Sequence, residues 1–208
     1  MNYPKIRINT AYLLNGNVIP LLLPQLEEEG REAEADREFI KQKWHGYTDA
    51  WSPYETTILA GMCEALDLEF TQNTIDVYLS PFRHSFSDPM VISTRYTDDR
   101  FIDVLTHELL HRLLTDNTKT PKEWDGILDV WKGLFGEEHE WNVLVHIPVH
   151  LMLKYIFRDI LHEEQRVERD KRLVGKYESY RKAWEYVEAH DYRECISRLR
   201  ASYGTRPL

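Results

Sequence analysis

Cysteine, basic charge and long apolar runs are all scarce in this sequence. Its 208 residues include only two cysteines, Cys63 and Cys195, whose spacing fits neither a disulfide framework nor a structural zinc ribbon. The formal net charge of -9 argues against the basic face that a nucleic-acid backbone requires. No apolar run is long enough for a membrane span, and residues 1–20 lack the continuous apolar core of a secretory signal. These absences favour a cytoplasmic protein with neither nucleic acid nor membrane as partner.

The composition is that of a globular protein, since 42% of the residues are hydrophobic and 12% are aromatic. The length suffices for one good hydrophobic core. The sequence contains no internal repeat and no linker that would divide it. We therefore predict a single domain over residues 1–208, with a charged and aromatic helical extension at the C-terminal end from about residue 161.

The most informative pattern is His107-Glu108-Leu109-Leu110-His111, an H-E-x-x-H motif. Two histidines four residues apart lie on the same face of a helix, so both can bind one metal ion. The glutamate between them can take a proton from a metal-bound water molecule. The motif therefore predicts a metal-dependent hydrolase.

The residues around the motif predict a helix that carries it in the middle. Thr97 or Asp98 provides an N-cap, and Asp116 followed by Asn117 provides a stop. The apolar residues that recur at helical spacing, and so define a buried stripe, are Ile102, Leu105, Leu109 and Leu113. The alternative is an ordinary helix with two surface histidines, and it is disfavoured because both histidines border the apolar stripe.

A catalytic zinc ion also needs a third protein ligand and an open position for water. The metzincin class is excluded, because its pattern requires Gly at position 114 and His at position 117, where this chain has Leu114 and Asn117. A thermolysin-like site would take an acidic ligand from a second helix. The acidic residues at a suitable distance are Asp129, Glu137, Glu138 and Glu140.

A histidine-rich segment, residues 138–150, offers another third ligand. On a helix, one face would carry the polar residues His139, Asn142, His146 and His150. Burying such a face is costly unless each group is hydrogen-bonded or bound to metal. We therefore predict that this helix packs against the motif helix, with His146 as the third ligand, His150 as the second choice and Glu140 as the third. Pro148 either kinks the helix or begins a new one. For each histidine, satisfaction by protein partners stays open as the alternative.

The rest of the chain predicts further helices around a small sheet. Alternation at Ile6, Ile8 and Thr10 is typical of an edge strand, and strands are also expected at residues 74–79 and 90–93. Helices are expected at residues 24–44, 54–66, 124–136 (interrupted), 154–172, 177–187 and 192–199. Ser52 is the predicted N-cap of the second of these helices, with Pro53 in its first position.

The segment Ser87–Tyr96 occupies a special place in this order of elements, since it directly precedes the motif helix. We expect it to be an edge strand. Its exposed backbone could pair with an extended peptide substrate, or it could be an ordinary edge strand, and both interpretations stay open.

The motif and its preceding strands, over residues 53–155, resemble the minimal zincins, a set of small metallopeptidases that includes the SprT-like and ImmA/IrrE-like groups. The resemblance implies an α+β, zincin-like fold, mostly helical, with a small mixed sheet next to the motif helix. The segment 140–152 is similar to the second helix of the ImmA/IrrE-like group, in which a Glu ligand is followed by a small-residue pattern, but His146 and Pro148 depart from it. The segments 87–92, 106–111 and 146–150 together resemble a family of bacterial and phage proteins, for which no substrate is implied.

These observations predict a zinc-dependent metallopeptidase, encoded by a bacterium or a phage, that acts on a peptide or protein substrate. Its metal would be Zn²⁺ on His107, His111 and His146, and Glu108 would activate the zinc-bound water. Candidates to stabilise the oxyanion are His139, His150 and Tyr96. One alternative is a zincin-fold regulatory or binding protein with a structural or non-proteolytic zinc site. Another is a metal-dependent hydrolase of a non-peptide amide. The sequence predicts neither the cleavage specificity nor the oligomeric state.

Overall fold

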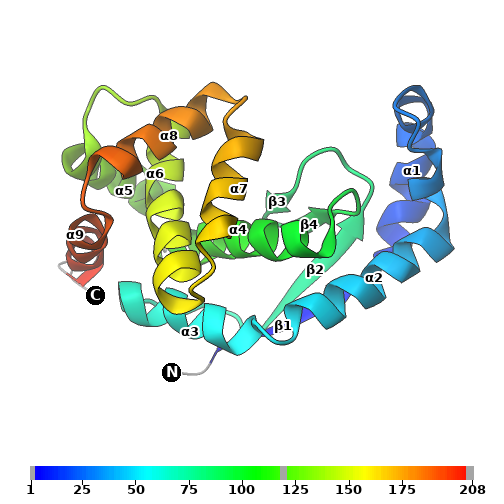
Figure 1. Ribbon diagram of the computed structural model, residues 1–208, viewed down its shortest axis with the longest axis horizontal. Helices are drawn as coiled ribbons and strands as arrows, with labels where there is room; N and C mark the ends of the chain where they lie inside the picture. Colours follow the sequence, from blue (N-terminus) through cyan, green and yellow to red (C-terminus); the bar gives the residue numbers. More distant parts are fainter. Residues whose placement is uncertain (1–2, 118–120, 205–208) are drawn as a thin grey trace. The chain divides into compact units, whose positions relative to one another are not determined.

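The computed structural model describes residues 3–117 and 121–204 (Figure 1). Helices predominate and a single four-stranded mixed sheet is present among these residues, so the predicted α+β class is confirmed. The chain divides into two compact units. The sheet unit comprises the chain up to Glu55 together with Gln72–Leu109, and the helical unit comprises Thr56–Thr71 and the chain from Leu110 onward.

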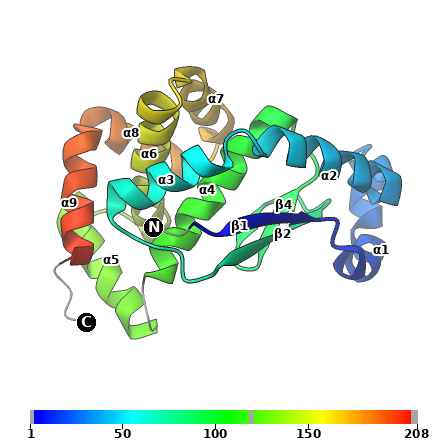
Figure 2. The same ribbon diagram turned by 90° about the horizontal axis from the view of Figure 1, so that it is seen from below.

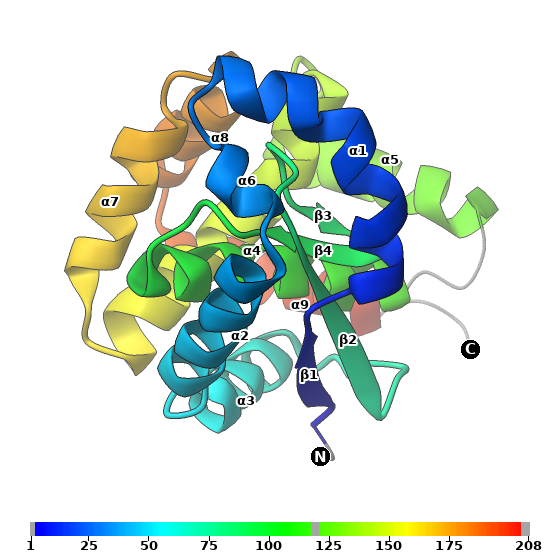
Figure 3. The same ribbon diagram turned by 90° about the vertical axis from the view of Figure 1, so that its right-hand side faces the viewer.

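The sheet unit contains four strands in the order β1-β2-β4-β3 (Figures 2 and 3). Their bounds are β1 (Lys5–Asn9), β2 (Thr74–Ser80), β3 (Phe86–Ser87) and β4 (Met90–Ser93). Both β1 and β4 pair with β2 in parallel, whereas β3 pairs with β4 in the antiparallel direction. The predicted alternation is confirmed, since Ile6, Ile8, Ile75, Val77 and Leu79 are all buried. As expected, β1 is an edge strand.

The expectation that the segment Ser87–Tyr96 forms an exposed edge strand is wrong. The chain turns tightly after Ser87, and β3 then pairs with β4, with Phe86 opposite Val91 and Ser87 opposite Met90. All four residues of β4 are buried. The edge of the sheet is instead the two-residue β3, so an extended peptide cannot pair with β4 along Met90 and Val91.

The predicted helix over residues 24–44 is also wrong, because two helices share this part of the chain. They are α1 (Tyr12–Glu28) and α2 (Arg37–Trp51), with a short 3₁₀ turn, η1 (Glu32–Ala35), between them. Gly30 follows α1 with φ 66°, a left-handed conformation that glycine adopts at little cost. The Asp36 carboxylate then accepts a hydrogen bond from the Glu38 amide at 2.8 Å and caps α2.

Ser52 is not the N-cap that the sequence predicts. The α2 helix continues past Trp44 to Trp51, because Tyr47 and Trp51 are buried, and Ser52 lies at its C-terminal end. The next helix, α3 (Glu55–Leu66), begins one residue after the predicted start and ends at the predicted residue. Its buried side chains, which belong to the helical unit, include Ile58, Leu59, Met62 and Leu66.

One buried amide joins α1 to the sheet. The Asn15 Nδ2 atom donates hydrogen bonds to the carbonyl oxygens of Thr10 and Leu79, each at 2.8 Å, and the side chain is only 3% exposed. We expect Asn15→Leu to lower the free energy of unfolding by about 1–3 kcal/mol, because it removes the partner of two carbonyl groups. Urea denaturation would measure this loss. The matched control is Asn17→Leu, which removes an exposed hydrogen bond to Leu13 in the same helix and should cost less than about 0.5 kcal/mol. Equal losses of unfolding free energy in the two variants would contradict the stabilising role of the buried Asn15 hydrogen bonds.

The helical unit is built around α6, which packs against the helices that flank it in sequence (Figure 1). Its elements besides α3 are α5 (Pro121–Phe135), α6 (Trp141–Tyr155), the π-helical segment η2 (Ile156–Ile160), α7 (Glu164–Val174), α8 (Glu178–Ala189) and α9 (Tyr192–Gly204). The α6 helix packs against α5, α7, α8 and α9. The region expected to be an extension from about residue 161 therefore contributes to the same hydrophobic core as α6. In the described parts of the chain, no helix combines the length and the apolar character needed to cross a membrane.

Two helix predictions in this unit need correction. The stretch expected to be an interrupted helix over residues 124–136 belongs to one continuous helix, α5, which ends at Phe135. In contrast, the expected helix over residues 154–172 is broken: η2 follows α6 directly, and the chain then turns at His162, which has φ 58°, before α7 begins. Ile156 and Phe157 stay buried with α6. In contrast, α7 buries only one side, which includes the charged residues Arg166 and Asp170, and exposes Glu164, Glu168 and Arg172.

Candidate metal centre

The motif helix is α4 (Asp98–Asp116), and its ends are fixed by capping contacts. The Thr97 Oγ1 atom accepts a hydrogen bond from the Arg100 amide at 3.3 Å. Of the two predicted N-cap residues, Thr97 and Asp98, the cap is therefore Thr97. At the other end, Asn117 Nδ2 donates to the Leu113 carbonyl oxygen at 2.8 Å. The stripe predicted to be buried is confirmed, since Ile102, Leu105, Leu109 and Leu113 are at most 2% exposed.

The α4 helix is continuous through the motif, although the boundary between the two units falls between Leu109 and Leu110. His107 and His111 therefore keep the spacing of one helical turn and share a face of α4. His107 is buried and His111 is half-buried. The helix itself thus sets the geometry of the first two candidate ligands.

The third histidine comes from α6, a helix that is almost entirely enclosed. Every residue from Val143 to Lys154 is buried, including His146 and His150. Pro148 lies within this helix and does not begin a new one, which decides between the two possibilities that the sequence left open.

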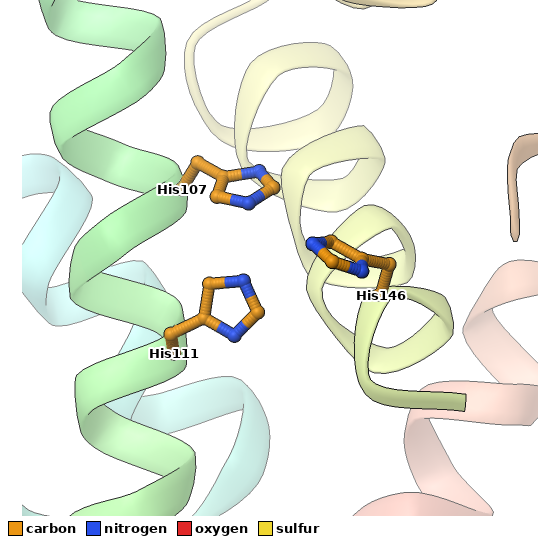
Figure 4. Close-up of side chains that lie close together, drawn as sticks. All are labelled: His107, His111 and His146. Atoms are coloured by element: carbon orange, nitrogen blue, oxygen red, sulfur yellow. The ribbon is translucent and has the colours of Figure 1, made fainter. Parts of the chain in front are cut away.

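The structure brings His107, His111 and His146 together. One ligand nitrogen from each lies within 4.8 Å of the other two. Figure 4 shows the imidazoles of His107 and His111 projecting from α4 toward that of His146 on α6. The rings of His111 and His146 are nearly perpendicular, at 89°, with centroids 5.1 Å apart. Three nitrogen donors in this arrangement could hold one metal ion.

A hydrogen bond orients the His146 ring. Its Nδ1 atom donates to the carbonyl oxygen of Asn142, one turn earlier in α6, at 2.5 Å. Because a carbonyl can only accept, this bond places the proton on Nδ1 and leaves the lone pair on Nε2. A backbone carbonyl that fixes the tautomer in this way is a common partner of metal-binding histidines.

Burial also favours the neutral form of these imidazoles. It lowers the pKa of His111 to about 3, with a further contribution from the nearby His146, and it lowers the pKa of His146 below its ordinary value. Neutral imidazole is the form that binds metal ions.

Glu108 lies beside this group and is half-buried. Within the described ranges, its carboxylate has neither a hydrogen bond nor an ion pair. Burial raises the pKa of this carboxyl group to about 8, since it disfavours the ionised form and no positive charge on a described residue offsets it. A cation held by the three histidines would supply that charge. The residues present therefore fit a bound divalent metal ion.

The other candidate ligands do not join this group. His150 is fully buried, and its ring is stacked on Trp184 with centroids 4.5 Å apart. Glu140 precedes the first residue of α6 and is exposed. The further acidic candidates outside the group are Asp129, Glu137 and Glu138.

The candidates for oxyanion stabilisation lie in different surroundings. His139 lies 5.7 Å from the ring of Tyr186, between ring centroids, and 3.7 Å from a Glu138 carboxylate oxygen. The hydroxyl of Tyr96, in the sheet unit, accepts a hydrogen bond from Ser85 Oγ at 3.5 Å. These contacts do not rank the candidates.

Sequence reasoning missed one neighbour of the candidate ligands. The ring of Tyr180, on α8, lies 4.0 Å from that of His146, between centroids. The helical spacing of Tyr180 and Trp184 indicated only a core-facing stripe. Tyr180 and Trp184 are four residues apart, as are His146 and His150. This equal spacing was the signal in the sequence that the two pairs could face each other.

No protein-family model, curated protein or solved structure matches this chain.

Proposed function

We propose that this protein is a zinc-dependent metallopeptidase of the zincin type, which hydrolyses peptide bonds. The observation that carries the proposal is the group of three buried or half-buried histidines with Glu108 next to His107 in the chain, a carboxylate that has no hydrogen bond or ion pair among the described residues. A further support is the order of elements before the motif helix, α3, β2, β3 and β4, which contains the helix and the two strands expected of a zincin-like fold with the two-residue β3 between those strands. The proposal does not depend on strand addition to β4, because β3 covers part of that strand.

The number of donors favours a catalytic site over a structural one. Structural zinc sites are closed by four protein ligands, whereas catalytic sites use three and keep one position open. In the part of the chain that the structure describes, no fourth His, Cys, Asp or Glu joins His107, His111 and His146. Three imidazole nitrogens are a donor set that suits Zn²⁺.

The roles of the chain's own residues follow from this arrangement. When bound, zinc would lower the pKa of a coordinated water molecule toward neutrality and polarise a carbonyl group. His107, His111 and His146 would hold the ion, and the Asn142 carbonyl would keep His146 in the required tautomer. Glu108 would accept the proton of the attacking water and deliver it to the leaving nitrogen, so that the amine departs uncharged.

The proposal predicts zinc-dependent cleavage of peptides. We expect the purified protein to contain about one zinc ion per chain, and to cleave members of a pooled quenched-fluorescent peptide library. A chelator should abolish cleavage, and added zinc should restore it. The control is the Cys63→Ala, Cys195→Ala double variant, which removes both thiols of the chain and should keep its zinc.

Zinc that binds and raises the unfolding temperature, without cleavage of any peptide pool, would contradict the proposed activity. That outcome would favour the regulatory or binding protein with a structural zinc site. Zinc bound by the wild type but lost from the double cysteine variant would place the metal elsewhere in the chain.

A further inference from the structure

Two aromatic side chains of α8 face two histidines of α6 in matching order. The ring of Tyr180 lies 4.0 Å from that of His146, and the ring of Trp184 lies 4.5 Å from that of His150. The two aromatic residues are four apart in α8, and the two histidines are four apart in α6. One turn of α8 therefore packs against one turn of α6. The His150 and Trp184 planes differ by only 14°, which makes this pair a stack.

The Trp184 end of this arrangement is anchored to a third helix. Trp184 Nε1 donates a buried hydrogen bond to the Asp170 Oδ2 atom on α7 at 3.0 Å. Trp184 and Asp170 are 4% and 2% exposed, so the bond is shielded from water. The position of α8 against α6 is therefore fixed one turn away from Tyr180.

Of the three histidines that the structure brings together, His146 is the one outside the motif, so its orientation depends on α6 and the neighbours of α6. The hydrogen bond to the Asn142 carbonyl selects the tautomer, but a bond at Nδ1 does not by itself set the inclination of the ring plane. The Tyr180 ring packs against the imidazole, with centroids 4.0 Å apart and planes inclined at 40°, so it restricts any tilt of the imidazole toward α8. Aromatic contacts at this distance stabilise the relative placement of the two rings beyond the effect of burying apolar area.

We infer that Tyr180 is a positioning residue of the metal centre, whose ring holds the His146 imidazole with Nε2 toward His107 and His111. The inference rests on the three-histidine metal site and not on peptide hydrolysis. It makes α8 a functional part of the centre, since the residue that restrains the third ligand comes from that helix.

The test compares metal binding by Tyr180→Phe and Tyr180→Leu with that of the wild type. Zinc affinity would be measured by competition with a chromophoric chelator, and ligand geometry by the visible spectrum of the Co²⁺-substituted protein. We expect Tyr180→Leu to lower zinc affinity about 10–100-fold and to change the Co²⁺ spectrum, whereas Tyr180→Phe keeps both nearly unchanged. The matched control is Tyr186→Leu, which removes a ring of the same size from α8, packed against His139 outside the metal group. It should bind zinc like the wild type.

Three outcomes would overturn the inference: unchanged affinity and spectrum in Tyr180→Leu, an equal loss in Tyr180→Phe, or an equal loss in Tyr186→Leu. The second would assign the effect to the hydroxyl group, and the third would assign it to general packing of α8. If Tyr180→Leu does not fold, as judged by circular dichroism, Tyr180→Met fills a similar volume without an aromatic face and takes its place. Since no readout uses turnover, an inactive but zinc-binding wild type would contradict the proposed function and leave this inference testable.

Discussion

Glu108→Gln is expected to lower kcat/KM for peptide hydrolysis by about 10²–10⁴-fold while zinc remains bound. The amide has nearly the shape of the carboxylate but cannot accept the proton of the attacking water. The three histidine nitrogens are untouched, so metal content should equal that of the wild type. Hydrolysis of the best peptide from the pooled library, measured together with metal content, would separate the two effects.

The same substitution carries a second expectation, which concerns stability. Because burial disfavours the ionised Glu108 carboxylate and no positive partner offsets this cost among the described residues, Gln should not destabilise the metal-free protein. Urea denaturation in the presence of a chelator would measure the free energy of unfolding. The control for activity is Glu138→Gln, an exposed glutamate outside the metal group. A Glu108→Gln protein as active as the wild type would contradict the proposed role of Glu108 as the proton acceptor.

His146→Ala is expected to lose zinc, whereas His150→Phe and Glu140→Gln keep it. Apparent binding free energies of about 10–16 kcal/mol for sites with four protein ligands correspond to about 3 kcal/mol per ligand. Removing one ligand should therefore weaken binding on the order of a hundredfold or more. His150→Phe retains a ring that can stack on Trp184 but has no nitrogen, so it tests ligation without opening a cavity.

Metal analysis of these variants alongside His107→Ala would check the assignment. Loss of zinc in His107→Ala together with retention in His146→Ala would contradict the three-histidine site. Loss of zinc in Glu140→Gln would then identify Glu140 as the third ligand, and loss of zinc in His150→Phe would identify His150 as the third ligand. Each result names one ligand, because each variant changes one candidate donor.

The sequence predicted the elements whose signal is local. The apolar stripe of α4, the Thr97 cap and the alternation in β1 and β2 depend on residues close together in the chain, and all are present. Predictions failed where a long-range contact overrides the local signal. The pairing of β3 with β4 converts an expected edge strand into an internal one. Likewise, burial of Tyr47 and Trp51 extends α2 beyond its expected end.

For the metal centre, the sequence alone determined that His107 and His111 share a face with Glu108 next to them, because a spacing of four residues fixes that geometry within any helix. Only the tertiary structure brought His146 close to them without His150 or Glu140, and placed Tyr180 against it. The physical reason is that helical spacing relates residues of one helix to each other. Which turn of α6 faces α4 or α8 depends on how side chains of different helices interlock, and no periodicity within a single segment specifies that packing.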